Sequence, residues 1–162
     1  NLQTGGLSIA LIAGFAKAVE LTFTDFDANV AHLRELSDYL LHELRKRISY
    51  IELNGAPGEG RAPHNVNISI DYIEGEAITM MLDMHGITVA TGSACASQGL
   101  KANYVLMAIG KNHVQSHGSM KFTISRYTTK EQLDYTVETL AHITEELRSR
   151  SPLYSALKNQ EK

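Results

Sequence analysis

The stretch "GSMKFTISRYTTKEQLDYTVETLAHITEELRSRS", residues 118–151, decides the fold because it joins a strand to the clearest helix of the chain. Phe122 and Ile124 alternate with polar residues, which predicts a half-buried strand. Thr128 and Glu131 have the spacing of a capping box, which predicts the start of a helix. Apolar residues then recur at three- and four-residue steps, as on one buried helix face: Leu133, Val137, Leu140, Ile143 and Leu147.

Three further strands are expected upstream, over "YIEL" (50–53), "NVNISIDY" (65–72) and "ITVA" (87–90). A long amphipathic helix is expected to begin after Thr24 or Asp25, with one apolar stripe: Val30, Leu33, Leu36, Leu40, Leu44 and Ile48. Shorter helices are expected over three segments: 7–20, 74–86 with Gly86 closing it, and 103–109. Because strands and helices mix, we expect a sheet, antiparallel or mixed, with helices on one face.

The composition of the 162-residue chain excludes several classes of protein. Apolar residues make up 43% and charged residues 20%, as in ordinary globular domains, and the net charge of −3 gives no reason to expect nucleic-acid binding. No apolar run approaches the roughly 18 residues of a membrane span. A single cysteine cannot form an internal disulfide, which favours the cytosol. The chain also lacks an initiator Met, so we expect a processed chain, a trimmed chain or a fragment.

That single cysteine, Cys95, lies in "ATGSACASQGL", residues 90–100. Its neighbours carry little apolar mass, whereas buried structural thiols pack among large apolar side chains. The composition therefore favours an exposed, flexible loop, in which a thiol can be deprotonated and can react. From the residues alone, an unreactive thiol that is merely tolerated there is an equally good interpretation.

Arg126 ends the strand of the opening stretch and precedes the capped helix. A guanidinium at a strand end can hold a carboxylate through two parallel hydrogen bonds. An arginine that forms a salt bridge at the start of a helix is the competing interpretation, and position alone favours it.

Other motifs carry less chemistry. His113 and His117 have the four-residue spacing of metal ligands on a helix, but Gly110, Gln115 and Gly118 argue against a regular helix there, and no third ligand follows. We therefore expect surface histidines and no metal site. "GAPGEG" (55–60) lacks the strand and helix that flank a nucleotide-binding loop.

Five segments in register resemble cysteine desulfurases of the NifS/IscS type, which are class V aminotransferases. They are "HNVNISIDYIEGEAITMML" (64–82), "TGSACAS" (91–97), "YVLMAIG" (104–110), "MKFTISRYTTKEQLDYTVETL" (120–140) and "SPLY" (151–154). The resemblance extends over about residues 9–157. It implies the C-terminal portion of such an enzyme: the α/β small domain of a fold-type-I pyridoxal phosphate-dependent transferase, with a mixed sheet and helices on one face.

The resemblance also implies the roles of individual residues. The family uses pyridoxal 5′-phosphate to take sulfur from L-cysteine, which leaves L-alanine and an enzyme persulfide. Cys95 falls on the persulfide-forming nucleophile, and Arg126 falls on the arginine that binds the substrate carboxylate. Gly6 falls where the family commonly has a threonine that contacts the cofactor phosphate, so no residue of this chain is assigned to the cofactor.

The resemblance implies that a large domain precedes this chain and carries the Schiff-base lysine, the ring-stacking histidine and the aspartate of the pyridine nitrogen. We therefore divide the chain into residues 1–24, the helical end of the large-domain region, and residues 25–162, the small domain with the cysteine loop. The implied partners are a large domain or complementary chain, a sulfur-acceptor or scaffold protein, and further copies of the chain. A cofactor-free sulfur carrier or interaction module, and an inactive fragment, stay open as alternatives.

Overall fold

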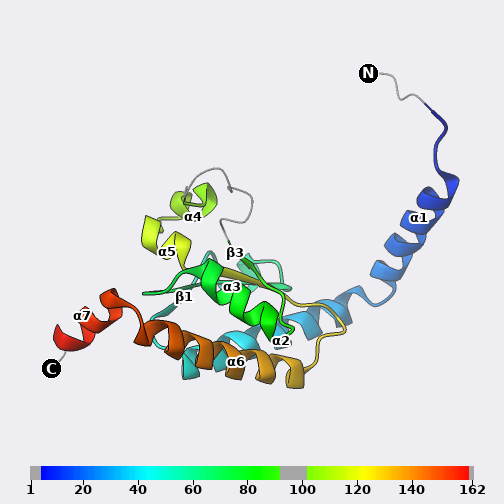
Figure 1. Cartoon of the computed structure of the whole chain (residues 1–162). Helices are drawn as coiled ribbons and strands as arrows, with labels where there is room; N and C mark the ends of the chain where they lie inside the picture. Colours follow the sequence, from blue (N-terminus) through cyan, green and yellow to red (C-terminus); the bar gives the residue numbers. More distant parts are fainter. Residues whose placement is uncertain (1–4, 92–101, 161–162) are drawn as a thin grey trace.

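The structure is a computed structural model that describes residues 5–91 and 102–160 (Figure 1). It contains seven α-helices, four strands and one 3₁₀ turn within these residues. In chain order they are α1 (Ile9–Thr24), α2 (Phe26–Arg47), β1 (Ile51–Leu53), the 3₁₀ turn η1 (Gly58–Gly60), β2 (Asn65–Ile70), α3 (Gly75–Met84), β3 (Ala90–Thr91), α4 (Tyr104–Ala108), α5 (His113–His117), β4 (Ser119–Thr123), α6 (Lys130–Ser149) and α7 (Pro152–Gln160).

The four strands form one sheet in the order β1-β2-β4-β3, and every described pair is antiparallel. Of the two expected arrangements, the antiparallel one is therefore correct and the mixed one is wrong. The central pair, β2 and β4, runs from Asn65 opposite Thr123 to Ser69 opposite Ser119. The strand expected over 87–90 is reduced to Ala90 and Thr91, because only these residues of the segment pair with β4.

One face of the sheet carries the hydrophobic core. The stripes predicted for α2 and α6 both face it, together with Ile78 and Leu82 of α3 and Ile68 and Met120 of the central strands. Leu40, Leu44 and Leu140 are fully buried. The three longest helices that follow Asp25 thus cover one face, as expected, and the core lies between them and the sheet.

The opposite face is polar, and the short helix α5 packs on it. The buried Ser69 hydroxyl donates to the carbonyl of Gln115 in α5 over 2.8 Å. Our expectation of no regular helix here is wrong because Asn112 and Gln115 form a reciprocal capping box. Two capping bonds suffice for a five-residue helix that also packs on the sheet.

The ends of two other helices follow local chemistry closely. α3 ends as expected at Gly86, which has a φ of +74°. There the Ile87 amide donates to the Leu82 carbonyl over 2.9 Å, as in a Schellman motif. α6 begins one residue later than expected, because Thr129 is its N-cap and Gln132 completes the capping box. Thr128 is not available as a cap because its hydroxyl accepts a hydrogen bond from the amide of Ser125.

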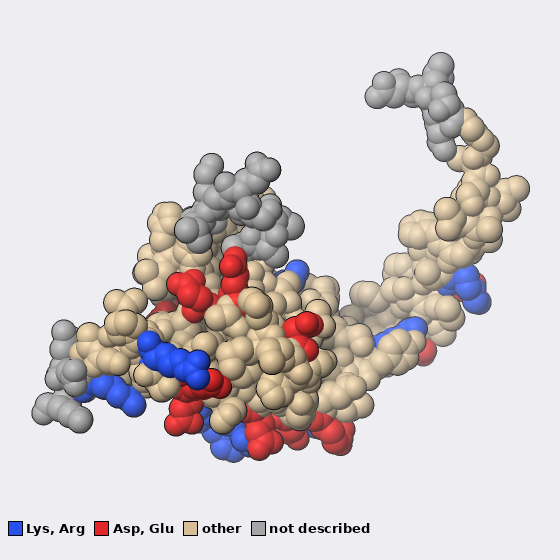
Figure 2. All heavy atoms as spheres, in the orientation of Figure 1, with Lys and Arg blue, Asp and Glu red and all other residues tan. Residues whose placement is uncertain are grey.

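Helix α1 differs from every other long helix of the chain because it buries no residue. It projects away from the sheet and its covering helices (Figure 1). Ile9, Phe15 and Phe23 are 80%, 73% and 70% exposed, and few charged side chains lie along the visible face of this arm (Figure 2). The break between α1 and α2 falls at Asp25. No helix in the described segments is both long and apolar enough to span a bilayer.

Gly118 marks the closest approach between two segments of the sheet region, and replacing it should destabilise the fold. Its carbonyl accepts a hydrogen bond from the Ile70 amide over 3.0 Å. A Cβ there would collide with the Ile70 carbonyl oxygen and lie 3.2 Å from that of Ile73. We expect Gly118→Ala to lower the free energy of unfolding by about 1–3 kcal/mol, since packed backbone cannot yield without strain. Urea denaturation of the purified variant measures it.

Gly14 provides the matched control, because it lies in α1 with open space where a Cβ would be. Gly14→Ala should leave stability unchanged or raise it by up to about 1 kcal/mol, the helix-propensity difference. A Gly118→Ala protein as stable as the parent chain would contradict the close approach.

Candidate functional site

Arg126 occupies a short turn that is fixed at both of its ends. On one side, Ile124 is buried, and its amide donates to the His64 carbonyl over 2.9 Å, which continues the pairing of β4 with β2. On the other side, Thr129 caps α6. Between them the Thr128 amide donates to the Ser125 carbonyl over 3.0 Å, which closes a four-residue turn. Arg126 is thus presented at the tip of a turn between a buried strand and a capped helix.

The side chains of Ser125 and Thr128 brace the same turn. The Ser125 amide donates to the Thr128 hydroxyl over 3.0 Å, and the Tyr127 amide donates to the Ser125 hydroxyl over 3.2 Å. Such side-chain bonds replace water as partners of the turn's backbone amides. The backbone that carries Arg126 is therefore held locally, without help from the arginine side chain.

The Arg126 side chain is exposed and forms no ion pair with any described residue. The competing interpretation of a salt bridge at the start of α6 thus finds no partner among residues 5–91 and 102–160. Its guanidinium donates from Nη2 to the Tyr127 hydroxyl over 2.7 Å, and its Cζ lies 4.9 Å from the centre of that ring. A guanidinium has five N–H donors, so four stay available for a carboxylate.

Cys95 lies outside the described residues, but both ends of its segment are placed. Thr91 enters the segment from β3, where it pairs with Met120 of β4. Beyond the segment, the Asn103 amide donates to the Ser116 hydroxyl of α5 over 2.9 Å, and the Asn103 side chain caps α4. The exposed loop that we expect around Cys95 stays a prediction.

Arg126 does not lie beside the start of the cysteine segment. β3 runs antiparallel to β4, so Thr91 is opposite Met120, close to the beginning of β4, whereas Arg126 follows its end. Pairing therefore places Thr91 and Arg126 at opposite ends of β4.

Gly6, His113 and His117 contribute little to the candidate site. Gly6 is exposed ahead of α1, with nothing within 4 Å of where a Cβ would be. His113, His117 and Glu74 are among the residues that line an apolar groove of about 450 Å³ beside α5. Nowhere in the described ranges do three His, Cys, Asp or Glu side chains gather closely enough to hold a metal ion.

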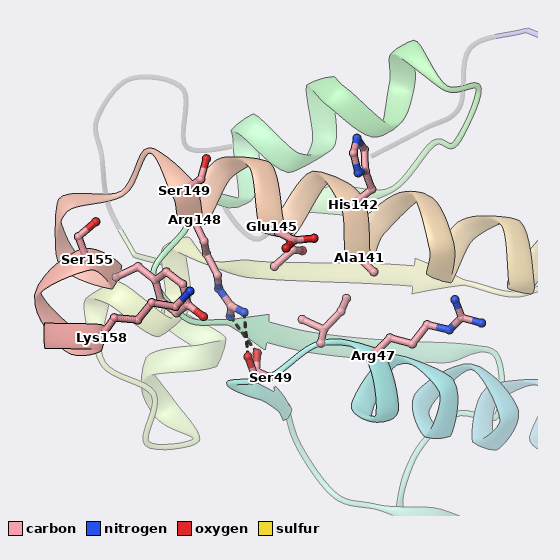
Figure 3. A pocket seen from close by; sticks show the side chains of 12 residues that line it. Arg47, Ser49, Ala141, His142, Glu145, Arg148, Ser149, Ser155 and Lys158 are labelled. Atoms are coloured by element: carbon pink, nitrogen blue, oxygen red, sulfur yellow. Dashed lines mark hydrogen bonds between the residues drawn. The ribbon is translucent and has the colours of Figure 1, made fainter. Parts of the chain in front are cut away.

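A larger groove of about 670 Å³ lies where α2, α6 and α7 meet (Figure 3). Arg148 lies in it, only 4% exposed. Its guanidinium points toward Ser49 (Figure 3), donating to the Ser49 carbonyl over 2.9 Å and to the Asp71 carbonyl over 3.1 Å. The rings of Tyr50 and Tyr154 flank it, with centres 5.6 and 5.1 Å from Cζ. Arg148 is therefore committed to holding the protein backbone.

Sequence reasoning missed Arg148, although a signal was available. Counting from Leu140, the buried stripe of α6 continues through Thr144 to Arg148 in steps of four, so the arginine falls on the core face. Burial lowers the pKa of Arg148 from its ordinary value, and nearby Tyr154 and Asp71 act in the opposite direction. An arginine stays charged at any ordinary pH even so.

With this geometry established, comparison with known proteins defines the class. The sequence matches the family model "Aminotransferase class-V" over residues 1–136, and the chain belongs to that family. Within it, the chain is 45% identical over 152 residues to cysteine desulfurase IscS of Dictyoglomus turgidum, covering 94% of this chain and 38% of that protein. Cysteine desulfurase IscS 1 of Archaeoglobus fulgidus is 44% identical over 154 residues, covering 95% of this chain and 40% of that protein.

A solved structure titled NifS-like protein superposes on 89% of this chain and 36% of its own, with a TM-score of 0.76 and 23% identity. The resemblance to NifS/IscS-type enzymes and the expected fold class are thereby confirmed, with an antiparallel sheet in place of the mixed one. The chain spans about two fifths of the length of these curated relatives.

The described residues do not fit pyridoxal phosphate, the cofactor that the family implies. A Schiff base needs a free lysine amine beside a phosphate cradle and a partner for the pyridine nitrogen. Lys111 is the buried lysine of the described chain, and its Nζ is 2.6 Å from the Glu52 carboxylate. Lys17, Lys46 and Lys130 are exposed and paired with Glu20, Glu43 and Glu35. Lys121 and Lys158 form no ion pair with a described residue, but both are exposed at the surface.

Proposed function

We propose that this chain is the small-domain part of a cysteine desulfurase. It works with a large domain that holds pyridoxal phosphate, and it contributes Cys95 as sulfur acceptor and Arg126 as carboxylate anchor. The observation that carries the proposal is the 45% identity to an IscS desulfurase across 94% of the chain. Arg126 supports it from the geometry, because it is exposed, lies in a braced turn and forms no ion pair with any described carboxylate.

The proposed reaction balances with no external oxidant. The Cys95 thiolate attacks the sulfur of L-cysteine, a sulfur–sulfur bond forms, and the carbon–sulfur bond of the substrate breaks. The carbon fragment takes up a proton and leaves as L-alanine, so the sulfur remains on the chain as a persulfide. A thiol alone cannot break that carbon–sulfur bond, which is why the reaction needs the large domain.

Arg126 would fix the substrate by its carboxylate. Its fork of N–H donors matches the two carboxylate oxygens, and its charge has no described carboxylate to satisfy first. Because the turn holds the Arg126 backbone, anchoring the substrate would order only one side chain. The cost of binding falls as less of the site has to be ordered.

Helix α1 would supply the contact with the large domain. Apolar residues are exposed along the whole length of α1, which is unusual for a helix whose surface faces only water. We propose that they pack against the large domain or against a second copy of the chain. The persulfide would then pass to a sulfur-acceptor or scaffold protein, in support of iron–sulfur cluster or thio-cofactor synthesis, in the cytoplasm.

The test uses a chimaera in which this chain replaces the 152 matched residues of the Dictyoglomus turgidum relative. We expect the chimaera to bind pyridoxal phosphate, turn yellow and release alanine from L-cysteine. The isolated chain should stay colourless and release none, and its mass in solution should exceed that of a monomer. Cys95→Ser in the chimaera should abolish the persulfide, measured by mass spectrometry of the chain.

Each alternative has its own outcome. Alanine release by the isolated chain would refute the need for a large domain. A monomeric chain that accepts sulfur on Cys95 from a persulfide donor, while the chimaera stays inactive, would indicate a cofactor-free carrier. A chimaera that folds and binds the cofactor yet neither releases alanine nor forms a persulfide would indicate an inactive fragment.

A further inference from the structure

Tyr127 follows Arg126 in the turn, and its side chain has no evident structural task. It is 74% exposed, so it contributes little to a core. The turn closes through the backbone and hydroxyls of Ser125 and Thr128, and the Tyr127 side chain takes no part. The contacts of this exposed aromatic ring therefore indicate what it does.

The described contact of the Tyr127 side chain is with Arg126. The phenol oxygen accepts the Nη2 hydrogen bond over 2.7 Å, while the guanidinium carbon lies 4.9 Å from the ring centre. A hydrogen bond and a cation–π contact together restrict a side chain that otherwise has four freely rotating bonds. The same contact uses only one of five donors, so a carboxylate can still be held through two of them.

We propose that Tyr127 is a positioning residue for Arg126: its hydroxyl and ring hold the guanidinium in the orientation that receives the substrate carboxylate. This inference rests on the proposed function of Arg126 as carboxylate anchor. Positioning acts on binding more than on turnover, because a pre-oriented group loses less freedom when the substrate arrives. The hydroxyl is the specific element, since phenylalanine retains the ring and removes only the hydrogen bond.

Chemical modification of the isolated chain tests the contact without cofactor or turnover. Phenylglyoxal reacts with free guanidinium groups, and peptide mass spectrometry gives the rate at each arginine. Tyr127→Phe should speed modification of Arg126 about two- to fivefold, because it removes one hydrogen bond of ordinary strength that restrains the guanidinium. Arg45, an exposed arginine of α2, is the internal reference and should not change.

Kinetics of the chimaera test the consequence. Tyr127→Phe should raise KM for L-cysteine about 3- to 10-fold with kcat nearly unchanged, the loss expected for one hydrogen bond. Tyr127→Ala, which also removes the ring, should raise KM further. In an Arg126→Ala background, Tyr127→Phe should have no additional effect, because the residue acts through the arginine.

The outcomes separate this inference from the proposed function. If the chimaera is inactive but Tyr127→Phe still frees Arg126 toward phenylglyoxal, the desulfurase proposal falls and the positioning contact stands. An unchanged modification rate at Arg126 overturns the positioning role, whatever the activity. In an active chimaera, an unchanged KM, or an equal effect with and without Arg126, also overturns it.

Discussion

Arg148→Ala is expected to lower the free energy of unfolding by about 3–5 kcal/mol, the largest stability effect among the substitutions considered. The guanidinium binds the carbonyls of Ser49 and Asp71. Each of these carbonyls precedes a tyrosine in the left-handed backbone region, Tyr50 with a φ of +52° and Tyr72 with a φ of +70°. Removing Arg148 leaves two carbonyls without these partners beside two strained residues.

Tyr50, Tyr72 and Tyr154 form an aromatic cluster that depends on the Arg148 guanidinium. The ring centres of Tyr50 and Tyr72 are 5.5 Å apart, and those of Tyr72 and Tyr154 are 5.8 Å apart. The rings of Tyr50 and Tyr154 flank the guanidinium, so its loss also leaves a cavity, which adds to the cost. α7, which carries Tyr154, should fray in the same variant, and this would be visible as faster amide exchange over residues 152–160.

Two variants control this measurement. Arg150→Ala removes an exposed arginine paired with Glu146 on the same helix and should cost less than about 0.5 kcal/mol. Arg148→Lys retains the charge but cannot reach both carbonyls with a planar fork, so it should recover only a small part of the loss. Equal stabilities of Arg148→Ala and Arg150→Ala in urea denaturation would show that Arg148 does not hold the backbone.

Arg126→Ala in the chimaera is expected to raise KM for L-cysteine about 10- to 150-fold, the equivalent of 1.5–3 kcal/mol for a hydrogen-bonded charged group. The turnover number should change less, because the carboxylate contact is made in both the bound substrate and the transition state. The KM of Arg126→Lys should lie between those of the parent chimaera and Arg126→Ala, since lysine keeps the charge and loses the bidentate fork. Steady-state alanine production measures all three.

A stability measurement on Arg126→Ala distinguishes a loss of substrate binding from a loss of folding. Arg126 is exposed, and within the described residues its side chain donates a hydrogen bond only to the adjacent Tyr127. Arg126→Ala should therefore change the stability of the isolated chain by less than about 0.5 kcal/mol. Arg150→Ala, at the far end of α6, should leave KM unaltered. An unchanged KM in Arg126→Ala, with the fold intact, would remove Arg126 from the substrate site.

The sequence by itself determined where the long elements lie and which face of each is buried. The stripes Leu36, Leu40, Leu44 and Leu133, Val137, Leu140 all reach the core, because helical periodicity records one-sided burial directly. Gly86 ended α3 as expected, because the left-handed position of that turn favours glycine. The family resemblance also came from sequence alone, through motifs whose order and spacing agree.

Only the tertiary structure decided which strands pair, where α5 forms and what the arginines do. Alternation of apolar residues gives a strand a face but no partner, so the antiparallel order β1-β2-β4-β3 had to be observed. Arg148 follows the helical period yet binds carbonyls 77 and 99 residues away in sequence. Arg126 forms no ion pair with a carboxylate in the described segments and donates a hydrogen bond to its neighbour Tyr127. Such roles depend on contacts between distant segments, which local periodicity does not encode.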